Sequence, residues 1–209
     1  MISAMLKPGI LLLAAGQARR FGADKLMAKL ADGQPVIAHT LKNLQWLAQK
    51  YGLELSVVVR HDNHALMRFL QAEHISFTIC PDAIQGMGNS IAHGIRSHQH
   101  WRGWFIALAD MPLVTQDTLE KIFLQAQQTP DNIVRPIVEI EGNKQPGHPV
   151  YFPRNMGFEL NKLAGDQGAK KIITQHPDML KWVSTEDQHI LTDIDTEKEL
   201  QNINRVNSN

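Results

Sequence analysis

The stretch GILLLAAGQARRFGADK, at residues 9–25, decides the fold. It begins with a continuous apolar run, Gly9–Ala15, which is typical of a β-strand that is buried on both faces. Such a strand lies in a parallel sheet that helices cover on both sides. Glycines and cations follow the run directly, so the same stretch also supplies the first candidate for a binding loop.

Strands and helices alternate over the first 130 residues of the chain. Short apolar or β-branched runs predict three further strands, at Leu55–Arg60, Ser76–Cys80 and Trp104–Ala109. Apolar residues at helical spacing predict four helices, at Ile37–Ala48, at Asn63–Glu73, after a cap at Asn89 or Ser90, and at Leu119–Ala126. This alternation produces βαβ units, so the sequence predicts an α/β fold with a mostly parallel sheet and right-handed crossovers.

The pattern changes after about residue 130. Ile133–Ile140 and Gly147–Phe152 flank the turn-forming sequence EGNK, so we expect a β-hairpin addition in the C-terminal half. The remaining elements are expected to be two short helices, one capped by Asp166 and ended before Pro177, a strand at Ile190–Ile194, and a helix opened by the Thr196–Glu199 capping box. No repeat or linker interrupts the pattern, which predicts one domain over residues 1–209.

Composition excludes several classes of function. The 209 residues are 43% hydrophobic and 20% charged, which is typical of a globular protein. Since 21 Lys and Arg balance 21 Asp and Glu, no net field favours nucleic acid as a partner. Cys80 is the only cysteine, which excludes an intrachain disulfide and a metal site built from several thiolates.

No stretch suggests membrane contact or export. The apolar run Ile10–Ala15 is shorter than the core of a signal peptide, and none approaches the roughly 20 apolar residues that cross a bilayer. We therefore expect a cytoplasmic protein.

Ligands of an open parallel sheet bind outside the carboxyl ends of its strands, near the point where the strand order reverses. Four segments follow predicted strand ends and carry most of the glycines, cations and carboxylates that a site could use: Ala14–Lys25, Pro81–Ser90, Asp110–Pro112 and Asp193–Thr196. We expect the functional site where these segments meet.

The first of these segments suits a small, multiply charged anion. It lacks both the GxGxxG dinucleotide pattern and the Gly-Lys-Ser/Thr of a Walker A loop. Its small residues can nevertheless present backbone N–H groups to phosphates. The segment and its continuation contain one acid, Asp24, and four cations: Arg19, Arg20, Lys25 and Lys29. The alternative is an ordinary turn with solvated cations.

Two further segments fit the same ligand. Gly86 and Gly88 allow a close backbone approach at the start of a helix, although plain capping would explain them as well. Asp110, at a strand end beside a phosphate loop, has the chemistry of a Mg²⁺ ligand; the alternative is that it caps the turn.

The pattern LAAGxxxRFGxxK resembles the signature of nucleotidyltransferases of the molybdenum-cofactor type. The stretches GMGNSI, DIDT, GHPV and LAGDQGAK resemble those of molybdenum cofactor cytidylyltransferases, so the similarity extends from Ile10 to about Leu200. This resemblance implies a three-layer Rossmann-like nucleotidyltransferase fold. Its nucleotide-binding half would span about residues 10–130, and its acceptor-substrate half about residues 131–200.

The resemblance also implies roles for individual residues. Arg20, Lys25 and Asp110 would be catalytic, and Asp110 and Asp195 would hold Mg²⁺, with Asp193 in reserve. The implied nucleotide-binding residues are Leu13, Ala14, Ala15, Gly16, Gln17, Lys25, Asp82, Gly86, Gly88 and Ser90, and the implied acceptor-binding residues are His148 and Asp166. The chain departs from the family pattern at Ala18, Lys170 and Glu197, where Ser or Gly, Arg and Pro are usual; Lys170 weakens any bidentate phosphate contact.

The implied reaction transfers CMP from CTP to the phosphate of molybdenum cofactor (molybdopterin) and releases pyrophosphate, with a recipient molybdoenzyme as a transient partner. Three alternatives stay open: guanylyl transfer, transfer to another phosphorylated acceptor, and a non-catalytic chaperone that binds the finished cofactor. Ala15 stands where guanylyl-transferring relatives usually have glycine, which favours cytidine. The joint presence of Lys25 and Asp110 counts against a chaperone.

Overall fold

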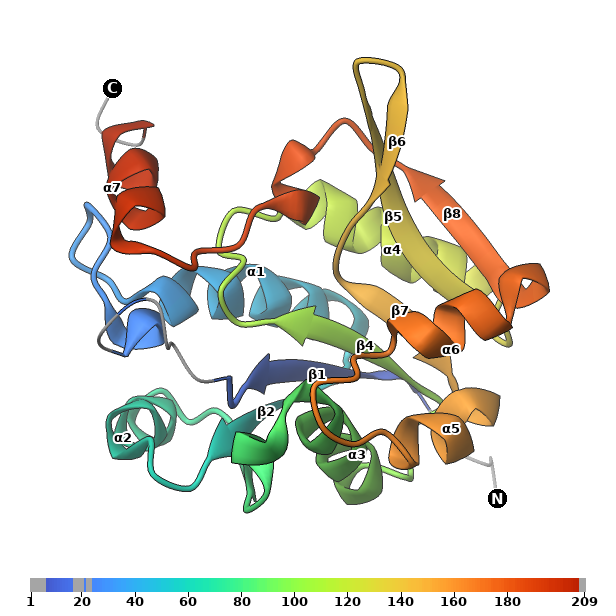
Figure 1. Ribbon diagram of the computed structural model, residues 1–209, viewed down its shortest axis with the longest axis horizontal. Coiled ribbons are helices and arrows are strands. Elements are labelled where there is room, and N and C mark those ends of the chain that lie inside the picture. Colours follow the sequence, from blue (N-terminus) through green and yellow to red (C-terminus); the bar gives the residue numbers. More distant parts are fainter. Residues whose placement is uncertain (1–6, 17–20, 22–23, 207–209) are drawn as a thin grey trace.

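The computed structural model describes residues 7–16, 21 and 24–206. Its sheet has eight strands in the order β3-β2-β1-β4-β7-β5-β6, with β8 paired to β5 (Figure 1). The strands are β1 (Gly9–Ala14), β2 (Glu54–Arg60), β3 (Phe77–Cys80), β4 (Gly103–Leu108), β5 (Ile133–Ile140), β6 (Asn143–Pro146), β7 (Val150–Pro153) and β8 (Leu180–Ser184). Four of the seven pairings are parallel, so the mostly parallel sheet is confirmed.

The strand order reverses beside β1. The chain moves outward from β1 to β2 and β3, and then returns to place β4 on the other side of β1. Both neighbours run parallel to β1, so the three strands end at one edge of the sheet. This reversal is the position at which an open α/β sheet binds its ligands.

Helices cover both faces of the sheet. They are α1 (Val36–Tyr51), α2 (His64–Ala72), α3 (Met87–Ser97), α4 (Gln116–Gln128), α5 (Gly157–Asn161), α6 (Lys170–Gln175) and α7 (Glu197–Val206). One core joins the sheet to α1, α2 and α4, and a second joins its other face to α3, α5 and α6. The expected three-layer α/β fold is thus confirmed.

The apolar run of β1 explains this arrangement. Ile10 and Leu12 belong to the first core and Leu11 and Leu13 to the second, so consecutive residues of one strand bury opposite faces. A strand with apolar side chains on both faces requires helices that pack against both sides of the sheet.

The hairpin differs from the expectation in its partner strand. β5 pairs with β6, which precedes Gly147, whereas β7 pairs mainly with β4. All four residues of β6 are exposed, and the expected second strand is the buried β7. Because β4 and β7 pair, both halves of the chain contribute to the same sheet.

The late strand was also wrongly placed. The extended strand is β8, where only Val183 of five residues is buried, so the apolar pattern is weak. The segment Gln188–Leu191 is instead a short 3-10 helix, capped by Asp187 through the backbone N–H of His189. The two buried isoleucines that suggested a strand, Ile190 and Ile194, bury their side chains without extended pairing.

Two predicted helix caps are wrong. Helix α3 begins at Met87, after Gly86, and Asn89 uses its side-chain oxygen to accept from the Gly165 N–H at 2.7 Å. Helix α6 begins at Lys170 after Ala169, and Asp166 lies in the preceding turn. The capping box that opens α7 is confirmed.

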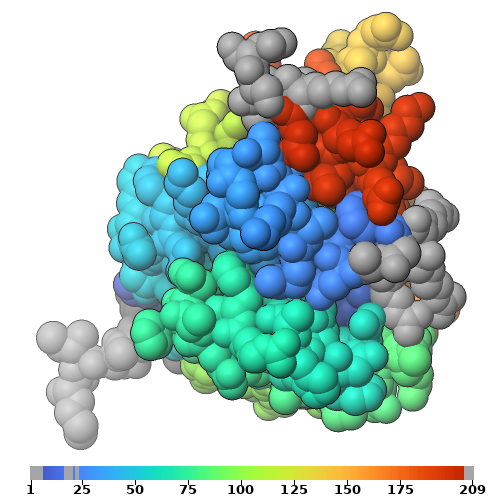
Figure 2. Space-filling model, turned by 90° about the vertical axis from the view of Figure 1, so that its left-hand side faces the viewer, coloured from blue at the N-terminus to red at the C-terminus, as the bar shows by residue number. Residues whose placement is uncertain are grey.

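The last helix lies against the segment that follows β1. Figure 2 shows α7 beside residues 24–35, and Ile194, Leu200 and Ile203 share a small apolar cluster with Phe21 and Val36. Among the described residues, no helix has the length and apolarity that crossing a membrane requires.

Candidate active site

A cavity of about 410 Å³ opens at the carboxyl ends of β1 and β4. Each of the four segments that the sequence singled out contributes to its lining: Ala14–Gly16 and Lys25, Gly86 and Ser90, Asp110, and Asp193 with Asp195. The expectation that these segments meet is confirmed.

The floor of the cavity is the end of β1. Ala14 and Ala15 are buried, and the Ala109 N–H donates to the Leu13 carbonyl at 3.1 Å, which holds the two strand ends together. A Cβ at Gly16 would meet no atom of the described residues within 4 Å. The backbone at this turn therefore faces open space, which suits a ligand that binds to N–H groups.

Lys25 joins two carboxylates that come from distant parts of the chain. The side chain of Asp24 caps the short helix that carries Lys25. The Lys25 Nζ lies 2.6 Å from Asp110 Oδ2 and 2.7 Å from Asp195 Oδ1. Burial alone would lower the pKa of Lys25, but the two carboxylates outweigh it and raise the pKa above its usual value.

Three carboxylates gather around this ammonium group. Ligand oxygens of Asp110, Asp193 and Asp195 all lie within 4.8 Å of one another. Burial raises the pKa of Asp193, and the neighbouring Asp110 and Asp195 add to the rise. Oxygen donors of this kind at the rim of a cavity fit a hard divalent cation such as Mg²⁺.

The chain positions Asp195 through its backbone. The Ile194 N–H donates to the Asp110 carbonyl at 3.0 Å, and the Ile194 side chain is fully buried. The Glu199 carboxylate accepts from the N–H groups of Asp195 and Thr196 at 2.8 and 2.7 Å. The capping box thus holds the residue that supplies the second carboxylate.

The two glycines of the third segment serve backbone packing. Gly86 has a φ of 129°, and a Cβ there would lie 2.2 Å from Gly165. A Cβ at Gly88 would lie 2.7 Å from the Gln167 carbonyl, and the Gly88 N–H donates to the Gly165 carbonyl at 2.8 Å. These contacts bring the loop at residues 163–168 over the start of α3, where Asp166 reaches the cavity.

The structure places most of the candidate residues around one cavity. Those that line it are Leu13, Ala14, Ala15, Gly16, Lys25, Gly86, Ser90, Asp110, Asp166 and Asp195. Three candidates do not: Asp82 is exposed, Gly88 is buried under the loop, and His148 lines other cavities. Gln17 and Arg20 lie outside the described residues.

Sequence reasoning missed part of the lining. The missed residues are Leu26, Ala83, Ile84, Met87, Leu108 and Ala109. All are neighbours of the quoted motifs, and four of them are directly adjacent to a candidate residue: Leu26, Ala83, Met87 and Ala109. Apolar side chains are typical of core positions, so the sequence did not mark them as lining residues. The structure shows Ile84 and Met87 to be 56% and 45% exposed, at the opening of the main cavity.

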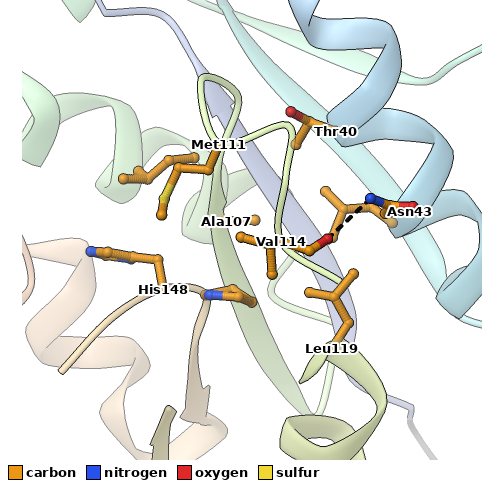
Figure 3. Close-up of a pocket in the computed structure, with 10 residues that line it drawn as sticks. Thr40, Asn43, Ala107, Met111, Val114, Leu119 and His148 are labelled. Atoms are coloured by element: carbon orange, nitrogen blue, oxygen red, sulfur yellow. Dashed lines mark hydrogen bonds between the residues drawn. The ribbon is translucent and has the colours of Figure 1, made fainter. Parts of the chain in front are cut away.

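His148 lies between two smaller cavities. One of about 20 Å³ is closed by α1, by the loop after β4 and by the segment before β7, as Figure 3 shows for Thr40, Met111 and His148. The other, of about 200 Å³, adjoins the main cavity. Burial and the nearby Arg135 lower the pKa of His148 to about 4, so its ring is neutral near pH 7.

Comparison with known proteins identifies the family. A family model described as MobA-like NTP transferase domain matches residues 10–180. The purine catabolism protein PucB of Bacillus subtilis (strain 168) is 28% identical over 207 aligned positions, which cover 94% of this chain and 95% of that protein.

Solved structures confirm the fold. Rv0371c of Mycobacterium tuberculosis H37Rv superposes with a TM-score of 0.80 at 22% identity, covering 96% of this chain and 98% of that one. A second structure of Rv0371c, in complex with manganese, gives a TM-score of 0.76 at 21% identity with the same coverage. Because the family model covers most of the residues, this chain belongs to the family of MobA-like NTP transferase domains and is a nucleotidyltransferase.

Proposed function

We propose that the protein is a Mg²⁺-dependent cytidylyltransferase that moves CMP from CTP to the phosphate of molybdenum cofactor and releases pyrophosphate. The observation that carries this proposal is the meeting of Lys25, Asp110 and Asp195 beside the turn after β1. A triphosphate needs cationic and backbone N–H donors, and its metal needs carboxylates; this rim of the sheet offers both.

The triphosphate is proposed to lie over Ala15 and Gly16 at the end of β1, with Arg20 and Lys25 as its cationic partners. The N-terminus of α3, near Gly86 and Ser90, adds N–H groups on the opposite wall of the same cavity. In this arrangement the nucleoside would lie toward Gly86 and Ser90.

The carboxylates of Asp110 and Asp195 are proposed to hold the Mg²⁺, with Asp193 beside them. When bound, Mg²⁺ supplies positive charge that stabilises the α-phosphate and the departing pyrophosphate. Lys25 now neutralises the same two carboxylates. Once a divalent cation takes over that role, the Lys25 ammonium becomes available to the phosphates.

The reaction itself needs no general base. An oxygen of the acceptor phosphate, already ionised near neutral pH, attacks the α-phosphorus of CTP, and the bond from that phosphorus to the β-phosphate bridging oxygen breaks. The electron pair leaves with pyrophosphate. The protein therefore has to align two anions and neutralise their charge, which is the work proposed for Lys25, Arg20 and the metal carboxylates.

The choice of CTP and of molybdenum cofactor comes from sequence resemblance, in the stretches GMGNSI at residues 86–91 and GHPV at residues 147–150. The name of the relative PucB places that protein in purine catabolism and states neither a nucleotide nor an acceptor. His148 and Asp166 are the proposed acceptor contacts.

Pyrophosphate release from each of the four common ribonucleoside triphosphates, with and without molybdenum cofactor, tests the proposal. We expect release from CTP only, and only when the cofactor is present. Release from GTP alone would indicate guanylyl transfer. Tight binding of the cofactor with no release from any triphosphate would indicate a chaperone and contradict the proposal.

A further inference from the structure

A second cavity adjoins the proposed triphosphate site. It has a volume of about 200 Å³ and shares Leu13, Met87 and Leu108 with the main cavity. A molecule in one cavity is therefore separated from a molecule in the other by no more than these side chains. In a transfer reaction, the attacking substrate has to lie in such a neighbouring space.

The walls of the second cavity are apolar and its charged groups are all basic. Ile91, Phe152 and Ile173 are among the buried residues that line it. Arg135 and Lys170 also line it, whereas no carboxylate of the described residues does. The main cavity, by contrast, is lined by Asp110, Asp166, Asp193 and Asp195.

Arg135 carries a charge that its surroundings leave uncompensated. Its Nε donates to the Gly147 carbonyl at 3.0 Å and its Nη2 to the Pro146 carbonyl at 3.3 Å. Within the described part of the chain, no carboxylate lies within 4.0 Å of the guanidinium. Burial lowers the pKa of Arg135, yet arginine stays protonated in proteins.

The neighbouring groups do not supply the missing negative charge. His148 lines the same cavity and is neutral near pH 7, and its buried Nδ1 has no hydrogen-bond partner among the residues that the structure describes. Half-buried charges in proteins are usually paired. The two carbonyl contacts orient the guanidinium without neutralising it and leave Nη1 available.

We propose that the second cavity binds the body of the acceptor and that Arg135 determines its specificity by binding an anionic oxygen remote from the attacking phosphate. The acceptor class that fits is a flat, largely apolar ring system with such an oxygen, because the walls are apolar and two carbonyl contacts hold the Arg135 guanidinium in place. This inference rests on the proposed function and adds a residue that the sequence motifs did not identify.

Pterin-6-carboxylate, a fluorescent flat ring with one carboxylate, is a suitable probe. Its titration with the full-length protein should show binding that Arg135→Ala weakens by about tenfold or more, as expected for loss of a charge-assisted hydrogen bond. Arg135→Ala should weaken the binding of pterin, which lacks the carboxylate, much less. Arg68→Ala, which removes an exposed arginine from α2, is the matched control and should bind like the wild type.

Arg135→Lys provides a second variant, in case the alanine variant fails to fold. It keeps the charge but cannot hold both carbonyls and the ligand, so its affinity for the probe should fall between the other two. Equal affinity of the wild type, Arg135→Lys and Arg135→Ala for pterin-6-carboxylate, or no binding by the wild type, would overturn the inference.

Calorimetry with CTP and Mg²⁺ separates this inference from the proposed function. Arg135→Ala should bind CTP as the wild type does, and in the full reaction it should raise the KM for the acceptor while leaving the KM for CTP unchanged. If the wild type binds pterin-6-carboxylate through Arg135 but does not bind CTP, the proposed function fails and the anion site stands. If Arg135→Ala weakens CTP as much as the probe, the separate role of Arg135 is contradicted.

Discussion

Lys25 is the residue on which the site depends. Its ammonium group lies between Asp110 and Asp195 at 2.6 and 2.7 Å, and its side chain is 13% exposed. A divalent cation held by the same carboxylates has to compete with it. In the proposed function, Lys25 would therefore oppose metal binding when no nucleotide is present and favour nucleotide binding when phosphates are present.

Lys25→Ala is expected to bind Mn²⁺ more tightly than the wild type in the absence of nucleotide, by about tenfold, since one charge-assisted hydrogen bond is worth that much. Paramagnetic resonance of free and bound Mn²⁺ measures the affinity. Lys42→Ala, on the exposed side of α1, is the control and should match the wild type. A Lys25→Ala protein with unchanged or weaker Mn²⁺ affinity would contradict the competition.

His148 gives the fold a dependence on pH. Its pKa is about 4 in the folded protein, against an ordinary histidine value of 6.5, so the unfolded chain takes up more protons between these values. The contribution of neutral His148 to the free energy of unfolding is fully present above pH 6.5 and falls as the pH is lowered toward 4. Between pH 7 and pH 5, the free energy of unfolding should fall by about 2 kcal/mol more in the wild type than in His148→Gln.

Urea denaturation of the wild type and His148→Gln at both pH values measures this difference. The subtraction removes the contribution of groups that the two proteins share. Equal losses in the two proteins would mean that His148 is not held neutral by burial.

Residue-level prediction from sequence worked best where chemistry and position coincide. Asp110 combines charge with a strand end, Lys25 and Asp195 belong to the charged segments singled out with it, and the structure brings the three together. Arg135 was missed because it belongs to an apolar strand with no motif around it, and only packing shows that its charge is uncompensated. Gly88 illustrates the reverse, since the glycine expected beside a ligand packs against a loop.

At the scale of elements, the segment after β8 decides whether the second carboxylate reaches the site. Asp187 holds this segment to the start of α4. Its carboxylate accepts from the Thr115 N–H at 2.9 Å, from the Thr115 hydroxyl at 2.8 Å and from the His189 N–H at 3.0 Å. Asp187 thus caps the 3-10 helix Gln188–Leu191, ties it to Thr115, the N-cap residue of α4, and sets the path toward Asp193 and Asp195.

Asp187→Ala should lower the free energy of unfolding by about 1–3 kcal/mol, because it removes the cap of the 3-10 helix and the acceptor of the Thr115 N–H and hydroxyl. Denaturation by urea measures the loss. Asp117→Ala, on the exposed face of α4, should cost less than about 1 kcal/mol. Similar losses in the two variants would contradict the anchoring role of Asp187.

Runs of apolar or β-branched residues were predictable as strands, whereas the mostly exposed strands β6 and β8 were not. β1, β2 and β4 are buried runs and were found nearly to the residue. β8 has one buried position, Val183, and its strand character comes from pairing with β5, which no local pattern records. The expected strand at Ile190–Ile194 failed for a related reason, since two buried isoleucines four residues apart also suit a capped 3-10 turn.

For the whole molecule, the topology explains why the site lies where it does. β1 and β4 are parallel neighbours whose carboxyl ends lie at one edge of the sheet. The chain passes from β1 to β2 and β3 on one side and then returns to form β4 on the other side of β1. Alternation of strands and helices was enough to predict that the four candidate segments meet at this edge. The pairing of β7 with β4, which adds the second half of the chain to the same sheet, required contacts that lie far apart in sequence.

The central claim is that a cationic turn and a carboxylate-held divalent ion bind a nucleoside triphosphate together. Isothermal calorimetry of CTP, with and without Mg²⁺, tests it most directly in the wild type, Lys25→Ala, Asp110→Asn and the control Lys42→Ala. We expect CTP to bind the wild type and Lys42→Ala only with Mg²⁺ present, and about tenfold or more weakly to the other two variants. Absence of CTP binding by the wild type with Mg²⁺, or equal affinity in all four proteins, would contradict joint binding of CTP by Lys25 and a carboxylate-held divalent ion.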